Sequence, residues 1–140
     1  GDQNYVADGS LSGTMGMGKR LESIKINLAN QSIAGGITYR THVQSIGWQE
    51  WKTDRKPAGT SGQELRLEAI KIKLTGSMAN QYDVYYRVHA QDYGWLGWAK
   101  NGSPAGTAAL SKRLESIQIL VLPIGSEPPL GNGNPPFVQG

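Results

Sequence analysis

The chain repeats itself at intervals of 46 and 47 residues, and this periodicity constrains its fold more than any other feature. Two short motifs recur at these intervals, Arg-Leu-Glu and Gly-Thr. Their first residues are Arg20, Arg66 and Arg113 for the tripeptide, and Gly13, Gly59 and Gly106 for the dipeptide. A single unit of this size cannot bury an apolar face by itself, so such repeats stack on their neighbours around a shared core. We therefore expect one domain made of three similar units.

Each unit is predicted to form β-strands separated by turns rich in Gly and Pro. Polar and apolar residues alternate over 37–44 and again over 84–91, which is the period of a half-buried strand. The stretch 69–74 alternates as well, with its isoleucines facing inward. Leu67 lies three residues before Ile70 and breaks this alternation, so we predict a β-bulge at Arg-Leu-Glu. No stretch shows a convincing helical period.

These patterns predict an all-β fold with a pseudo-threefold repeat architecture. A β-prism-like arrangement, with one sheet for each repeat, is favoured, and a β-trefoil is the alternative. The first repeat is partial because it lacks the segment equivalent to 31–46. The repeats span residues 1–30, 31–77 and 78–121, so that the three form one domain over 1–121.

The last segment, residues 122–140, differs in composition from the repeats because it holds five of the seven prolines. One interpretation is an extended linker to a neighbouring domain, since Pro-Pro pairs oppose sheet pairing. The other is a closing strand in which Phe137, Val138 and Gln139 pair beside Gly1 and join the ends of a ring. The sequence leaves both interpretations open.

Composition and motif content argue against several classes of function. The chain has no cysteine, and its net charge of +3 comes from basic residues interleaved with acids, so we expect no nucleic-acid partner. No apolar stretch approaches the roughly 20 residues of a membrane span. There is no nucleophile elbow and no phosphate-binding loop, and the two histidines, His42 and His89, are not in a metal-ligand cluster. We therefore expect no enzyme activity, no cofactor and no metal.

Several linked motifs carry a family resemblance. The pattern H-V-Q-x-x-G-W-x-x-W, followed by A-G-T and R-L-E-[AS]-I-[KQ]-I, resembles the clostridial hydrophobic repeat with a conserved tryptophan, the ChW repeat. The second repeat matches it from Val43 to Ile70, and the third from Gly94 to Ile117. The first repeat departs from the pattern, with Asp2 and Tyr5 in place of the two tryptophans.

The resemblance implies a secreted or surface-attached module of a larger multidomain protein, from Gram-positive and mostly clostridial bacteria. The role it implies is non-catalytic attachment to carbohydrate, cell wall or host surface. A protein–protein adhesion module is the alternative, because exposed aromatic residues are enriched in interface hot spots. Tyrosines near Trp95 would serve such an interface: Tyr82, Tyr85, Tyr86 and Tyr93.

The paired tryptophans are the strongest candidates for ligand contact, since sugars stack on aromatic rings. Residues three apart on a strand point to opposite faces, so one tryptophan of each pair is expected in the core and the other outside. We assign Trp51 and Trp98 to the core, because Tyr5 keeps an aromatic residue at that place in the first repeat. The predicted ligand-binding residues are Trp48, His42, Tyr39, Trp95, His89 and Tyr86.

The repeated polar motifs are assigned to structure. Arg and Glu of each Arg-Leu-Glu share one face of a strand, and we expect them to form an ion pair that locks the bulge; in the alternative, Glu accepts sugar hydroxyls while Arg orients it. The residues concerned are Arg20 and Glu22, Arg66 and Glu68, and Arg113 and Glu115. Gly-Thr is expected to shape a turn in each repeat, at Gly59-Thr60 and Gly106-Thr107.

Overall fold

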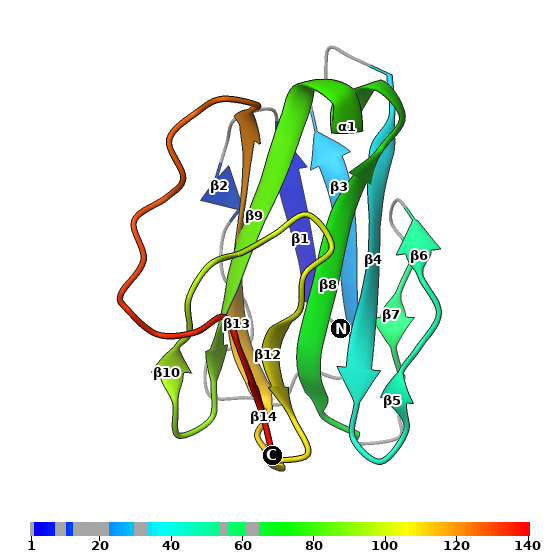
Figure 1. The fold of residues 1–140 in the computed structure, drawn as a ribbon. Helices are drawn as coiled ribbons and strands as arrows, with labels where there is room; N and C mark the ends of the chain where they lie inside the picture. Colours follow the sequence, from blue (N-terminus) through cyan, green and yellow to red (C-terminus); the bar gives the residue numbers. More distant parts are fainter. Residues whose placement is uncertain (1, 8–10, 13–22, 30–33, 54–55, 61–64) are drawn as a thin grey trace.

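The computed structural model describes residues 2–7, 11–12, 23–29, 34–53, 56–60 and 65–140, and nearly all of its regular structure is strand (Figure 1). The strands are β1 (Asp2–Ala7), β2 (Leu11–Ser12), β3 (Ser23–Ala29), β4 (Gly36–Val43), β5 (Gly47–Trp48), β6 (Lys52–Thr53), β7 (Ala58–Gly59), β8 (Leu67–Thr75), β9 (Tyr82–Ala90), β10 (Gly94–Trp95), β11 (Ala99–Lys100), β12 (Ala105–Ala108), β13 (Leu114–Pro123) and β14 (Phe137–Gln139). The all-β prediction is confirmed, and the three repeats fit a pseudo-threefold arrangement. The motif residues Gly13, Arg20 and Glu22 lie outside the described part of the chain, and Tyr5 lies in β1.

The second and third repeats share one layout, which follows from their matching sequence patterns. A long central strand pairs antiparallel with the last long strand of its own repeat: β4 with β8, and β9 with β13. Two short strands, β5 and β6 or β10 and β11, fold back onto the other edge of the central strand. Both long pairs shift register at the Arg-Leu-Glu motif, so the predicted bulge is confirmed in the two repeats where it is described.

A short strand from each repeat pairs with a different repeat. In the second repeat β7 pairs with β3 of the first, and in the third repeat β12 pairs with β8 of the second. The two pairings have equivalent register, since Ala58 lies opposite Ile24 and Ala105 opposite Ile70. The first repeat completes the cycle, because β2 pairs with β13 of the third, with Ser12 opposite Ile119. Each repeat therefore completes the sheet of another, and β2, β7 and β12 are called the exchanged strands below.

The first repeat fills the place of its absent central strand in a different way. Here β1 pairs directly with β3 along the edge that β4 and β9 occupy in the other repeats. The pairing is parallel rather than antiparallel. It gives the backbone groups on that edge of β3 hydrogen-bonding partners, which a buried sheet edge requires.

The core is a single body built on the isoleucines that the sequence pattern points inward. Equivalent positions of the three last strands carry the same residue, and each is at most 1% exposed: Ile24, Ile70 and Ile117, then Ile26, Ile72 and Ile119. Leu67 and Leu114, on the far side of the bulge, are also fully buried. One cluster joins all of these side chains, so the predicted shared core is confirmed. Burying each isoleucine contributes roughly 1.5–3 kcal/mol.

Two features differ from the simplest prediction. The described strands form three sheets and no closed barrel, so the β-trefoil alternative does not hold; the β-prism stays a prediction. The helix α1 (Gly76–Gln81) joins β8 to β9 and is the one helix in the described residues. Its six residues are too few to show a 3.6-residue hydrophobic period.

The proline-rich segment packs against the third repeat and ends in a strand. Strand β14 runs parallel to β12, and the loop before it swings out from the end of β13 and returns (Figure 1). The segment therefore packs on the third repeat instead of extending away as a linker. Its last residues form a strand, as the second interpretation expected, but this strand lies beside β12, and Gly1 is outside the described residues. Its prolines do not oppose the pairing, because their carbonyl groups accept hydrogen bonds: Pro135 O from Gly97 N at 3.1 Å and Pro136 O from Gly106 N at 2.9 Å.

The close approach of β12 to β8 predicts different effects of an added side chain at two glycines, Gly106 in β12 and Gly94 in β10, which both have a positive φ. Gly106 has a φ of 124°, and a Cβ there would overlap the carbonyl oxygen of Glu68 and lie 2.7 Å from Ala69 Cα. Gly94 has a φ of 74° and no neighbouring atom within 4 Å of that position. We expect Gly106→Ala to lower the free energy of unfolding by more than about 3 kcal/mol and Gly94→Ala by only about 1 kcal/mol. Urea denaturation measures both, and equal losses would contradict the close approach of β12 to β8.

Candidate functional site

A stack of aromatic and cationic side chains covers the outer face of the second repeat. The guanidinium carbon of Arg40, on β4, lies 5.8 Å from the ring centroid of Trp48 and 5.5 Å from that of Trp51. Lys71 and Lys73, on the neighbouring strand β8, place their ammonium groups 4.5 Å from Trp48 and 4.4 Å from Trp51. Cations at these distances are attracted to the ring faces, and the attraction orders both partners.

The third repeat carries the same stack with fewer charges. The guanidinium carbon of Arg87 lies 4.8 Å from the centroids of both Trp95 and Trp98. The positions equivalent to Lys71 and Lys73 are the neutral Gln118 and Leu120. Gln118 accepts a hydrogen bond from Arg87 Nε at 2.6 Å. The two stacks therefore share a geometry and differ in charge.

Both tryptophans of each pair face outward, so the assignment of Trp51 and Trp98 to the core is wrong. Each is half-buried against an arginine on the sheet's outer face. The prediction assumed one continuous strand, but β5 ends at Trp48 and β6 begins at Lys52. The chain turns a corner between them, so the alternation of faces does not extend to Trp51. In the third repeat the residue that enters the core at this corner is Leu96, which is 2% exposed.

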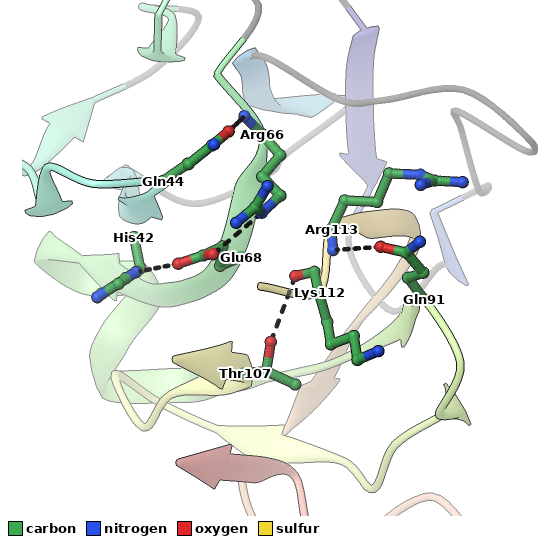
Figure 2. A network of polar contacts seen from close by, with 8 residues as sticks. All are labelled: His42, Gln44, Arg66, Glu68, Gln91, Thr107, Lys112 and Arg113. Atoms are coloured by element: carbon green, nitrogen blue, oxygen red, sulfur yellow. Dashed lines mark hydrogen bonds and ion pairs between the residues drawn. The ribbon is translucent and has the colours of Figure 1, made fainter. Parts of the chain in front are cut away.

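A carboxylate lies behind each stack, and it is buried in the second repeat and partly exposed in the third. The side chain of Glu68 is 5% exposed and engages both oxygens, Oε1 with His42 Nδ1 at 3.0 Å and Oε2 with Arg66 Nε at 3.2 Å. Figure 2 shows His42 and Arg66 reaching Glu68 from two sides. Glu68 lies where β8 shifts register, so the predicted ion pair at the bulge is confirmed.

The third repeat has the same contacts, and in both repeats the histidine also touches the first tryptophan of the pair. Glu115 binds His89 Nδ1 at 3.1 Å and Arg113 Nη2 at 3.2 Å. The His42 ring meets Trp48 edge-on at 5.3 Å between centroids, and the His89 ring meets Trp95 in the same way at 5.4 Å. The histidines therefore position the tryptophans while remaining partly exposed themselves.

Two glutamines that the sequence reasoning did not select brace the bulges. The side-chain oxygen of Gln44 accepts a hydrogen bond from Arg66 N at 3.2 Å, and Gln44 N donates to Arg66 O at 3.0 Å (Figure 2). Gln91 has the same relation to Arg113, at 3.5 Å and 2.9 Å. Their recurrence at an interval of 47 residues was the available signal, and the same is true of Arg40 and Arg87.

Tyr39 and Tyr86 do not belong to a ligand site, which corrects the prediction for both. Each side chain is fully buried. Their hydroxyl groups donate to the carbonyl oxygens of Lys56 and Ser103, which lie just before the exchanged strands β7 and β12. These tyrosines therefore anchor the exchange inside the core. Burial raises the pKa of Tyr86 to about 12.

The Gly-Thr motif lies in the exchanged strands and not in an isolated turn. Gly59 and Gly106 have φ values of 114° and 124°, a conformation that glycine adopts without strain. Thr60 and Thr107 are buried beside them, and Thr107 Oγ1 donates to Lys112 O at 3.3 Å. The structure thus places this motif where two repeats meet.

The corner at Trp48 opens into a hollow of about 420 Å³. It is lined by Ile46, Trp48, Gln49, Glu50, Lys52, Pro57 and Gly59. In the third repeat the proline-rich segment lies against the equivalent corner. Asn132 and Asn134 donate from Nδ2 to Trp95 O at 2.9 Å and 3.0 Å, and Trp98 Nε1 donates to Leu130 O at 3.2 Å.

Two searches restricted to the described residues were negative. No group of three or more His, Cys, Asp or Glu side chains is arranged to hold a metal ion there. Within the same residues, no helix has the length and apolar character needed to cross a membrane.

The family model for clostridial hydrophobic W, ChW, matches residues 1–30, 42–76 and 89–123. These three matches cover more than half of the chain and coincide with the three repeats, which confirms the predicted resemblance. The chain matches no curated protein and no solved structure.

The different burial of Glu68 and Glu115 predicts unequal effects of the same substitution. Glu68→Gln removes a charge that bonds His42 and Arg66, and we expect the free energy of unfolding to fall by about 2 kcal/mol. Glu115→Gln is the matched control, because the Glu115 side chain is 17% exposed against 5% for Glu68. Water can replace part of the bonding to His89 and Arg113 that Glu115 loses, so we expect the free energy of unfolding to fall by about half as much as for Glu68→Gln. Thermal and urea unfolding compare the two, and an equal or larger loss at Glu115 would contradict the role of burial.

The buried hydroxyl of Tyr86 predicts a loss of stability in alkali. Its pKa is about 12 in the folded protein, against 10.0 for an unperturbed tyrosine. Between these pH values the unfolded state has released the proton and the folded state retains it, so the free energy of unfolding decreases as pH rises. The decrease amounts to roughly 2–3 kcal/mol and is absent below about pH 10. Denaturation at stepped pH should show a shallower alkaline decline for Tyr86→Phe, and an unchanged decline would refute the assignment.

Proposed function

The chain belongs to the clostridial hydrophobic W family, and on this premise we propose that it is a non-catalytic module that binds carbohydrate or a bacterial cell-wall polymer. The proposal includes its setting, a secreted or surface-attached protein of which this module is one part. The observation that carries it is the aromatic and cationic stack of the second repeat beside an open hollow.

The hollow supplies the groups that sugar recognition uses. Trp48 lines it and offers an apolar indole surface to the C–H face of a sugar ring. Gln49, Glu50 and Lys52 line it as well and provide donors and acceptors for hydroxyl groups. A few convergent polar groups around an aromatic wall are typical of small-ligand sites.

The contacts of Glu68 and Glu115 support the non-catalytic part of the proposal. Both oxygens of Glu68 and of Glu115 bond to a histidine and an arginine of the same repeat. Neither carboxylate is therefore available as a proton donor or nucleophile. Because the arrangement recurs in two repeats, it suits a repeated scaffold better than one asymmetric active site.

An adhesion module for a protein partner is the second candidate, and one observation favours it. Ile46 and Tyr93 occupy equivalent positions in front of the two tryptophan corners and are 52% and 41% exposed. Exposed apolar side chains beside tryptophan are common in protein interfaces. The tyrosine cluster suggested by the sequence is smaller than expected, because Tyr85 and Tyr86 are buried. Displacement by soluble sugars separates the candidates, since only a carbohydrate-binding module releases its target.

The open corner predicts that one tryptophan matters more than its counterpart. We expect Trp48→Ala to weaken co-sedimentation with purified Gram-positive cell walls by at least about tenfold, as removal of a central aromatic contact does. Trp95→Ala is the matched control and should bind almost normally, because the proline-rich segment already contacts that corner. Circular dichroism and thermal unfolding verify that both variants fold. Unchanged binding by Trp48→Ala would reject the proposed function.

A further inference from the structure

Three cations lie together on the outer face of β4 and β8, where like charges are unfavourable. In the register of the two strands Arg40 is directly opposite Lys71, and Lys73 is two residues further along β8. Like charges placed directly opposite in a sheet destabilise it. This arrangement therefore requires an explanation other than the stability of the sheet.

The cations are not neutralised by neighbouring acids. In the described part of the chain no carboxylate lies within ion-pair distance of Arg40, Lys71 or Lys73; their contacts are the tryptophan rings, and Arg40 Nε also donates to Gln49 O at 2.8 Å. The acid closest to them along β8, Glu68, is fully engaged at the bulge. Glu50 lines the same hollow as Trp48 and forms no ion pair with these three cations in the described part of the chain.

The third repeat is an internal control for this face. It has the same strands, the same bulge and the same stack of an arginine on two tryptophans. Yet Gln118 and Leu120 stand opposite Arg87 and Tyr85, where the second repeat has its lysines. The scaffold therefore forms without Lys71 and Lys73. Folding does not require these two charges, which points to a role in binding.

We propose that the face formed by Arg40, Lys71, Lys73 and Trp48 binds an acidic glycan, a sugar polymer that carries carboxylate or phosphate groups. The inference rests on the proposed function and narrows its ligand. The ammonium groups of Lys71 and Lys73 and the guanidinium group of Arg40 attract the anionic groups, while Trp48 contacts the sugar. The tryptophan rings hold the cations in place before the ligand arrives, which reduces the entropy lost on binding.

Of the second and third repeats, the same comparison assigns the site to the second. The stack of the third repeat has a single cation, Arg87, whose Nε is bonded to Gln118. Its corner is in contact with Leu130, Asn132 and Asn134 of the proline-rich segment. The acidic glycan therefore binds the second repeat and not the third.

Affinity electrophoresis in native gels tests the inference with three polymers: polygalacturonate for carboxylate, poly(glycerol phosphate) for phosphate, and dextran as the neutral control. We expect one or both acidic polymers to retard the protein and dextran to leave it unaffected. Lys71→Gln with Lys73→Leu copies the third repeat and should weaken the binding roughly tenfold, from the loss of two partly exposed charges. Raising the salt to 1 M should abolish retardation, because the Debye length falls from about 8 Å to about 3 Å.

A basic protein can also bind polyanions without a specific site, so a variant of matched charge is needed. Lys71→Gln and Lys112→Gln each remove one positive charge, but Lys112 pairs with Asp92 in the third repeat, away from this face. We expect only Lys71→Gln to weaken binding. The double variant should unfold at about the same temperature as the wild type, because it removes both a like-charge pair and two cation–ring contacts, which have opposite effects on stability. Thermal unfolding therefore shows that its loss of binding is not a loss of fold.

Four results would overturn the inference that the ligand is acidic. Equal retardation by dextran, unchanged binding by the double variant, or an equal loss from Lys112→Gln would overturn the acidic ligand. Absence of retardation by both acidic polymers would overturn it too. In any of these cases, cell-wall binding that still depends on Trp48 would preserve the proposed function, whereas wall binding independent of Trp48 would reject both.

Discussion

The structure depends on the exchange of one short strand between repeats. Because β7 pairs with β3 and β12 with β8, each sheet is completed by a strand from a different repeat, and the isoleucines of all three pack in one core. The exchange brings the two backbones too close for a side chain at Gly106, and Gly59 has the same conformation. Tyr39 and Tyr86 bind the chain just before each exchanged strand. Glycine, tyrosine and isoleucine recur together because one pairing requires all of them.

The bulge connects this pairing to the outer surface. At the bulge β8 holds one extra residue, Glu68, which lets Leu67 return to the core instead of following the alternation. The extra carboxylate fixes His42, and His42 meets Trp48 edge-on. A displacement at the bulge would therefore move both the exchanged strand behind it and the tryptophan in front of it. Scaffold and candidate site share one support, so a variant of either must be examined for effects on the other.

The sequence predicted the structure correctly where side chains alternate along a continuous strand, and incorrectly where the strand is interrupted. The period, the inward isoleucines and the bulge follow from side-chain alternation along continuous strands. The same alternation places Tyr39 on the inner face with Ile37 and Val43. The assignment of Tyr39 to a ligand site was therefore inconsistent with the alternation. Trp51 was misplaced because the corner after Trp48 interrupts the strand. The prolines of the last segment were expected to oppose sheet pairing because proline lacks an N–H donor. That expectation overlooked the proline carbonyl groups, which still accept hydrogen bonds.

Differences between equivalent positions are more informative about binding than the repeated residues are. Residues shared by the second and third repeats serve the exchange, the bulge and the stack, which both repeats possess. Glu50 of the second repeat and Gly97 of the third are at equivalent positions in the tryptophan corner. A Cβ at Gly97 would overlap Asn134 O, so a side chain at this position is incompatible with the proline-rich segment. Glu50 therefore keeps the corner of the second repeat closed to such a segment and open to an external ligand. Lys71 and Lys73, at the positions equivalent to Gln118 and Leu120, support the same reasoning: the fold of the third repeat forms without lysines there, so their charges are available for a partner.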